Sequence, residues 1–312
     1  RIDVGNMTGR LGEDDLHDEV MRGIRSAMDE VKPDAWLVAE NGDFVASDLD
    51  GFGWHGAMNY QGFMRPLWNW INQNSSIGGG FQGLPFEMPK IGGKSLVASM
   101  VQFSSSIPWR SLVASMVLLD SHDTARFKTV VCGDRKRHLS GLTALFTYPG
   151  VPSIFAGDEL GLEGSWGEDS RRTINWENSD SWDATLLAEV KTLIQIRKER
   201  DALINGGLRW IYIDEDAFGY LRESKKETIF VFISRKAITA SIKKKVGIQK
   251  AKKTKKKSKL KKKLKTLLKL LKKLLIKLIG PKKMLRISCA GIGSAATRRS
   301  KARAGMNWLE MK

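Results

Sequence analysis

The sequence is poor in cysteine and has no long apolar run in its first three quarters. Two cysteines, Cys132 and Cys289, occur in 312 residues. This number excludes a disulfide framework and fits a reducing compartment. Residues 1–235 contain no apolar run long enough to cross a membrane. No signal peptide is visible at the first residues. We therefore expect a cytoplasmic protein.

Acidic residues are almost absent from the last quarter. Residues 1–235 contain 25 Lys and Arg against 33 Asp and Glu, a net charge of −8. Residues 236–312 contain 27 Lys and Arg and a single acid, Glu310, a net charge of +26. The sequence pI of about 9.9 therefore describes the tail and not the body. Because the positive charge belongs to the tail alone, the basic pI is no reason to expect a specific nucleic-acid partner.

The tail contains a lysine-rich segment, which we place at residues 241–283. Between Lys243 and Lys283 there are 20 lysines and no acid. Six leucines fall on one face of a helix there: Leu260, Leu264, Leu267, Leu271, Leu274 and Leu278. A basic amphipathic helix can bind an anionic membrane or other anionic surface without specificity. A low-complexity product of an A-rich reading frame is the alternative, and the residues leave both open.

The body alternates between amphipathic stretches and short apolar runs. Helical spacing of apolar residues predicts helices over 16–31 and 182–200. Short apolar runs, including "AWLVAE" and "VPSIFAGDE", predict buried parallel strands. From Gly206 the pattern changes to alternation and turns, which predicts a small antiparallel β module.

Polar residues follow several of the predicted parallel strands. They are Asp3, Glu40, His122 with Asp123, and Asp158 with Glu159. A (β/α)8 barrel collects its active site at such strand ends, and a doubly wound sheet would give a similar pattern. Taken singly, an acid after a strand is more often a helix cap or a turn residue.

Two of these features have a chemical consequence. Arg1 and Asp3 are two residues apart, so both side chains lie on one face of a strand. An arginine there can keep a carboxylate ionised by charge pairing. His122 and Asp123 follow the apolar run 117–119 and place an imidazole beside a carboxylate.

Together the segments "RIDVGN", "AEN" and "LLDSHDTARF" resemble conserved motifs of the α-amylase family of glycoside hydrolases, in the family's order. The segment "GDELGLEGSWGEDSRRTINW" resembles the same family, and most closely its neopullulanase and cyclomaltodextrinase branch. The resemblance covers roughly residues 1–235. It implies α/β architecture, with strands 4 to 8 of a (β/α)8 barrel followed by a partial β-sandwich domain C and the Lys-rich helical tail.

The resemblance also implies roles for five residues. Asp3 falls on the nucleophile, Glu40 on the general acid/base and Asp123 on the transition-state-stabilising aspartate. Arg1 and His122 fall on substrate-binding positions. The implied activity is retaining hydrolysis of α-1,4-linked glucooligosaccharides, with α-glucan transglycosylation as an alternative. No cofactor or metal ion is implied, and the oligomeric state stays open.

Aromatic residues near these motifs could stack on sugar rings. Trp54, Tyr60, Trp68 and Trp166 are the candidates. Packing in the core or in loops is the more frequent reason for any one such residue.

The sequence departs from the family pattern at both ends. It starts at the end of the fourth barrel strand, and the lysine-rich segment interrupts the expected domain C. We therefore expect an N-terminally truncated chain with impaired activity. Its predicted parts are a partial barrel (1–205), a partial domain C (206–240), the lysine-rich segment (241–283) and a remnant (284–312). A catalytically inactive chain that binds anionic membrane or nucleic acid through its tail is the alternative from another class.

Overall fold

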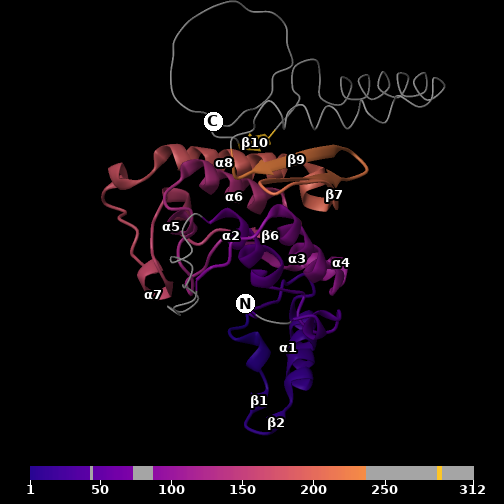
Figure 1. Cartoon of the computed structure of the whole chain (residues 1–312). Coiled ribbons are helices and arrows are strands. Elements are labelled where there is room, and N and C mark those ends of the chain that lie inside the picture. Colours follow the sequence, from indigo (N-terminus) through magenta and orange to yellow (C-terminus); the bar gives the residue numbers. More distant parts are fainter. Residues whose placement is uncertain (43–44, 73–86, 237–286, 290–312) are drawn as a thin grey trace, which may run out of the picture.

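The structure is a computed structural model that describes residues 1–42, 45–72, 87–236 and 287–289 (Figure 1). Its helices are α1 (His17–Val31), α2 (Arg65–Ile71), α3 (Gly93–Ser105), α4 (Trp109–Ala114), α5 (Phe127–Val130), α6 (Arg135–Thr147), α7 (Gly167–Ser170), α8 (Ala184–Glu199) and α9 (Asp201–Asn205). Its strands are β1 (Arg10–Leu11), β2 (Asp14–Asp15), β3 (Val38–Ala39), β4 (Gly56–Ala57), β5 (Met116–Leu118), β6 (Val151–Ser153), β7 (Gly207–Ile213), β8 (Ala217–Glu223), β9 (Thr228–Ser234) and β10 (Ile287–Cys289). Shorter helical turns lie at Gly5–Met7, Ser47–Leu49, Tyr60–Met64, Asp158–Leu160 and Ser179–Ser181.

Five parallel segments lie side by side in chain order. Ile2 forms a parallel bridge with Ala39 of β3, and β3 pairs with β4. Met58 then bridges Met116, which begins β5, and β5 pairs with β6. Sequential parallel pairing with helices between the strands is the topology of a (β/α)8 barrel. The structure thus confirms the prediction of a partial barrel, whose strand ends gather on one side.

The strand over 151–153 is less buried than the sequence predicted. Val151 is 38% exposed, and the two residues after it are half-buried. The reason is positional: β6 pairs with β5 along one edge, and no second strand among the described residues pairs with it. The expectation of a fully buried strand was wrong here.

The predicted antiparallel module is present at the opposite end of the molecule from α1 (Figure 1). Strands β7, β8 and β9 pair antiparallel in chain order, with a register shift between Trp210 and Tyr212 of β7. The strand β10 adds to β9 in parallel. The first strand starts at Gly207, beside the predicted start at 206, while the domain limits themselves stay a prediction.

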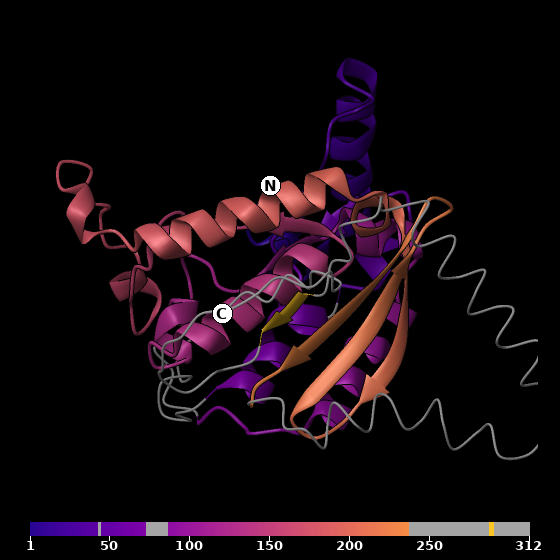
Figure 2. The ribbon, with the colours of Figure 1, turned by 90° about the horizontal axis from the view of Figure 1, so that it is seen from above.

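The barrel helices and the C-terminal sheet share one core. Figure 2 shows α6 between the long helix α8 and the strands β7 to β9. Leu142 of α6, Leu193 of α8 and Tyr220 of β8 belong to a single cluster of buried side chains. The residue before α8, Asp183, is its N-cap, and its carboxylate accepts a hydrogen bond from the Leu186 backbone N–H.

Helix α1 projects from the body together with the β1–β2 hairpin (Figure 1). The spacing in the sequence predicted an apolar face running from Leu16 to Val31. In the structure these two residues are 55% and 87% exposed, and Met21 is fully buried instead. The helix packs on the barrel through Met21, with Ile24 and Met28 partly buried against the same cluster, and its first residue His17 is 1% exposed.

The predicted lysine-rich helix over 241–283 lies outside the described residues, as do most of residues 284–312. Within the part of the chain that the structure describes, no helix has both the length and the apolar character that a membrane span requires.

Candidate functional site

The end of β3 brings together the first three candidate residues. The backbone N–H of Ile2 donates to the Val38 carbonyl, and that of Glu40 donates to the Ile2 carbonyl, both at 2.9 Å. This pairing places Arg1 beside Glu40. The Arg1 guanidinium donates from Nη1 to Asp3 Oδ1 at 3.0 Å and from Nη2 to Glu40 Oε1. The predicted pairing of Arg1 with Asp3 is confirmed, and one guanidinium bridges both carboxylates.

The backbone after Asp3 folds tightly around Glu40. The Val4 N–H donates to Glu40 Oε2 at 3.2 Å, and the Gly5 N–H donates to the Glu40 carbonyl at 2.8 Å. Val4 has φ 42° and ψ 51°, a left-handed conformation that is rare for a β-branched residue. Such strain persists only where surrounding contacts impose it, and it concentrates at functional sites.

The end of β5 brings His122 and Asp123 to the same place. One side-chain atom from each of Glu40, His122 and Asp123 lies within 4.8 Å of the others. His122 Nε2 lies 3.4 Å from Asp123 Oδ2. Glu40 is the least exposed of the three, with 13% of its side chain accessible, whereas 75% of the Asp3 side chain is accessible.

This group could offer three ligand atoms to a metal ion, but the charges around it argue against one. Arg1 pairs with Glu40, and Arg171 pairs with Asp123. Two guanidinium groups already neutralise the carboxylates that a cation would need. The arrangement suits a substrate with hydroxyl groups, which can accept from the arginines and donate to the carboxylates.

Sequence reasoning missed Arg171. It lies just after α7, where Nη2 donates to Asp123 Oδ1 and Nε donates to the His122 carbonyl, both at 2.9 Å. It therefore holds the side chain of one candidate residue and the backbone of the other. The segment that contains it was recognised as similar to the family, but nothing in its spacing singled out this arginine.

Behind the site, Tyr60 supports the loop after β5. Its hydroxyl donates to Ser121 Oγ at 2.9 Å, and Ser121 Oγ accepts from the Asp123 N–H at 3.2 Å. Burial, followed by the nearby carboxylates of Glu40 and Asp123, raises the pKa of Tyr60 to about 12. Tyr60 therefore stays neutral and keeps its proton for this hydrogen bond at any ordinary pH.

Three of the four aromatic candidates are core residues. Trp54, Tyr60 and Trp68 are at most 5% exposed, so they cannot offer a ring face to a sugar. Trp166 is 44% exposed, and its neighbour Gly167 packs against the Asp123 backbone. A Cβ at Gly167 would lie 3.2 Å from Asp123 Cα, so the absence of a side chain allows this close approach. Only Trp166 of the four is exposed next to the site.

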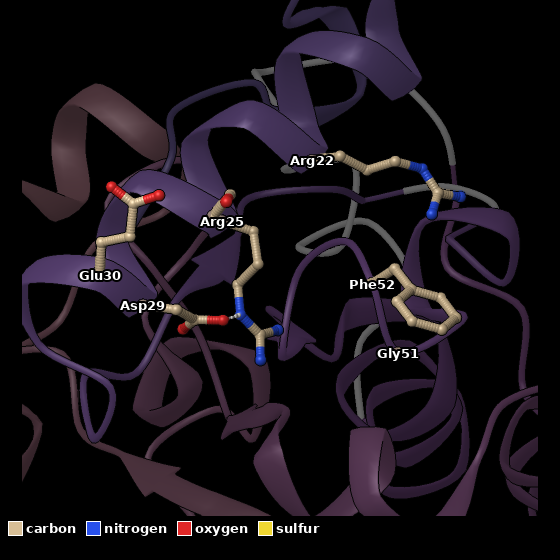
Figure 3. A pocket seen from close by; sticks show the side chains of 7 residues that line it. Arg22, Arg25, Asp29, Glu30, Gly51 and Phe52 are labelled. Atoms are coloured by element: carbon tan, nitrogen blue, oxygen red, sulfur yellow. Dashed lines mark hydrogen bonds and ion pairs between the residues drawn. The ribbon is translucent and has the colours of Figure 1, made fainter.

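An open hollow on α1 is a separate feature (Figure 3). It is lined by Arg22, Arg25, Ser26, Asp29, Glu30, Gly51 and Phe52. Its arginines already have partners, since Arg22 pairs with Asp50 and Arg25 with Asp29. None of the candidate site residues lines it.

Comparison with known proteins places these residues in context. The family described as "Alpha amylase, catalytic domain" matches residues 13–177. The matched segment contains Glu40, His122, Asp123 and Arg171, whereas Arg1 and Asp3 precede it.

Individual relatives agree with this match. A cyclomaltodextrinase from Bacillus sp is 28% identical over 237 residues, which cover 75% of this chain and 38% of the relative. An amylopullulanase from Thermoanaerobacter thermohydrosulfuricus is 30% identical over 214 residues, or 64% of this chain and 14% of the relative. The chain thus spans well under half the length of these two proteins.

Solved structures show the same fold. The cyclic alpha-maltosyl-(1→6)-maltose hydrolase of Arthrobacter globiformis superposes with a TM-score of 0.61 at 27% identity, covering 71% of this chain and 47% of that one. The debranching enzyme of Nostoc punctiforme gives 0.65 at 26% identity, covering 76% and 47%.

Proposed function

The chain belongs to the alpha-amylase family, and on that premise we propose that it provides the catalytic groups of a retaining glycoside hydrolase that acts on α-1,4-linked glucooligosaccharides. The observation that carries the proposal is the meeting of Arg1, Asp3 and Glu40 with His122 and Asp123 at adjacent strand ends. The names of relatives and of structural neighbours, which include cyclomaltodextrinase and amylopullulanase, support an α-glucan as the substrate.

The proposed roles follow from what each group can do. A retaining enzyme needs two carboxyl groups about 5–5.5 Å apart, one to attack the anomeric carbon and one to protonate the leaving oxygen. Asp3 and Glu40 share one guanidinium, which supports the short spacing. Asp3 is the proposed nucleophile and Glu40 the proposed acid/base.

Asp123 and His122 are proposed to bind the hydroxyl groups of the sugar ring. Their side chains lie within hydrogen-bonding range of the same space as Glu40. Hydrogen bonds to ring hydroxyls that strengthen in the oxocarbenium-like transition state lower the barrier by several kcal/mol in glycosidases. Arg171 keeps Asp123 oriented toward that space.

The contact between Arg1 and Glu40 must change during the reaction. Glu40 has to carry a proton when it protonates the leaving oxygen, and in the structure its Oε1 accepts from Arg1 and its Oε2 from the Val4 N–H. Because a neighbouring guanidinium favours the ionised carboxylate, we propose that substrate takes the place of Arg1 at Glu40 and leaves Arg1 to hold Asp3 alone. This exchange would couple sugar binding to the ability of Glu40 to protonate the leaving oxygen.

Hydrolysis of maltohexaose by the full chain tests the proposal. Glu40→Gln and Asp3→Asn should each lower turnover by several orders of magnitude, and Asp3→Asn should abolish trapping of a covalent glycosyl intermediate. The matched controls are Glu87→Gln and Asp34→Asn, which make the same changes at exposed positions away from the site. Near-normal rates in Glu40→Gln or Asp3→Asn would remove that residue from its role, and no turnover by the parent chain would favour the inactive alternative.

Product analysis separates hydrolysis from transglycosylation. Both begin with attack by Asp3, and they differ in whether water or a sugar hydroxyl resolves the intermediate. Products shorter than maltohexaose support hydrolysis, and products longer than it support transfer.

A further inference from the structure

A buried charged cluster lies directly behind the loop that carries His122 and Asp123. Asp120 lies two residues after β5, Asp158 lies in the turn after β6, and Arg126 lies between them in sequence, just before α5. The three residues are 3%, 5% and 1% exposed. Burying one cation and two carboxyl groups costs free energy unless they satisfy one another, so their presence points to a specific task.

Arg126 connects three segments around the site. Its Nη1 donates to Asp158 Oδ1 at 2.8 Å and to the Phe155 carbonyl at 3.2 Å. Its Nε donates to the Ser170 carbonyl at 3.0 Å, and its guanidinium carbon lies 3.6 Å from the centre of the Phe155 ring. Ser170 immediately precedes Arg171, so this arginine fixes the backbone from which Arg171 reaches Asp123.

Asp120 closes the loop itself. Its Oδ2 accepts from the Phe127 N–H at 2.6 Å, which ties together the two ends of the segment that carries His122 and Asp123. Its Oδ1 is buried and receives no hydrogen bond from an N–H or O–H group among the described residues. The carboxyl group of Asp158 lies within hydrogen-bonding reach of the Asp120 carboxyl group, so one proton shared by the two acids can supply a donor to this buried group.

The charges around the pair support this shared proton. Burial, followed by the neighbouring Asp158 carboxylate, raises the pKa of Asp120 well above its ordinary value. Burial also raises the pKa of Asp158, although Arg126 opposes that rise and Glu159 adds to it. With one proton, the two acids and Arg126 form a neutral unit in an apolar surrounding.

We propose that Asp120, Arg126 and Asp158 act together as positioning residues that hold the His122–Asp123 loop and Arg171 in place against Glu40. The importance of that placement for turnover rests on the proposed function. The cluster touches no substrate. It acts through the Phe127 N–H on one side and through the Ser170 carbonyl on the other.

Two substitutions of Asp120 distinguish a positioning role of its hydrogen bonds from a general effect on stability. Asp120→Asn keeps an oxygen for the Phe127 N–H and offers an amide donor to Asp158, so it should keep kcat on maltohexaose within about threefold of the parent. Asp120→Ala removes the acceptor and should lower kcat on the order of 10²-fold, the usual consequence of about 1 Å of misplacement. Val190→Ala, a buried truncation in α8, is the control for loss of stability and should leave kcat unchanged.

A second readout does not depend on activity. The chain contains four histidines, so the imidazole NMR signal of His122 can be assigned with His122→Asn. This signal should shift in Asp120→Ala and stay in place in Asp120→Asn and Val190→Ala. Arg126→Lys keeps the charge but cannot bond to Asp158 and Ser170 at once. It should shift the signal as well, and it serves as the test if Asp120→Ala does not fold.

Failure of the positioning proposal can be distinguished from failure of the proposed hydrolase function. Should the parent chain show no turnover, the proposed function fails and the His122 signal alone decides the positioning role. An unshifted His122 signal in both Asp120→Ala and Arg126→Lys would overturn the proposal. Equal impairment by Asp120→Asn and Asp120→Ala would overturn it too, because the hydrogen-bond geometry would then not matter.

Discussion

Replacing Arg126 with methionine should destabilise the protein more than almost any other single substitution. The ion pair that it forms with Asp158 is nearly inaccessible, at 2% and 6% exposure for the two side chains. Methionine fills much of the same volume but leaves a buried carboxylate pair without its cation. Breaking a buried pair in this way costs about 3–5 kcal/mol, a large share of the roughly 5–15 kcal/mol that separates folded from unfolded chains.

The loss should depend on pH in a defined direction. Arg126 lowers the pKa of both Asp120 and Asp158, so its removal raises those values further. An acid whose folded pKa lies above its unfolded value of about 3.9 contributes stability that is present below that value and is lost as pH rises through the folded pKa. The deficit of Arg126→Met should therefore be largest near neutral pH and should shrink as pH falls toward about 4.

Urea unfolding followed by tryptophan fluorescence, at neutral pH and at mildly acidic pH, measures this effect. The double variant Arg126→Met with Asp158→Asn should recover most of the lost free energy, because the uncompensated charge is then gone. A deficit under about 1 kcal/mol at neutral pH would refute the reasoning. The same conclusion would follow from equal deficits at both pH values.

Three further predictions concern other parts of the molecule. Burial lowers the pKa of His138 to about 4, so this histidine is neutral when folded and charged when unfolded below about 6.5. The neutral His138 contributes up to ~3 kcal/mol to stability, and this contribution should be lost as pH falls from about 6.5 to about 4. The variant His138→Phe should remove this part of the pH dependence of the urea midpoint. Gly150 has φ 127°, and a Cβ there would lie 2.3 Å from Val117 Cγ2, whereas Gly133 has φ 69° and open space around it. Gly150→Ala should therefore lower the thermal midpoint clearly more than Gly133→Ala, and equal shifts would show that packing between β5 and β6 adds nothing to backbone strain. Arg171→Gln should lower kcat/KM on maltohexaose by roughly 10²-fold through misplacement of Asp123. Its urea midpoint should change little because the pair is partly exposed, and an unchanged kcat/KM would exclude Arg171 from the site.

The sequence alone determined the architecture and the candidate residues of the site. Buried parallel strands are recognisable in a sequence as short apolar runs between amphipathic helices. A (β/α)8 barrel places its functional groups at the ends of these strands, even when the loops differ. A doubly wound sheet would give a similar pattern, so the resemblance of these segments to the α-amylase family was what predicted a shared site for Arg1, Asp3, Glu40 and His122–Asp123. The structure places these residues together.

What the sequence could not decide were the long-range partners. Asp158 followed a strand just as Glu40 did, yet it turns inward to Arg126 while Glu40 faces the site. Arg171 reaches Asp123 across 48 positions of sequence. Neither direction is encoded locally, because the side chain's environment is set by segments that only the folded chain brings near.

The segment "SLVASMV" occurs twice in the sequence, and its two copies show the same limit for backbone structure. The copy at Ser95–Val101 lies wholly within α3, whereas the copy at Ser111–Val117 ends α4 and begins β5. In the second copy Ser115 is extended, with ψ 144°, and its side chain accepts the N–H of Ala57 while its carbonyl accepts the N–H of Val151. Identical local propensities thus gave two conformations, because the neighbouring strands offered the second copy a sheet to join and offered none to the first.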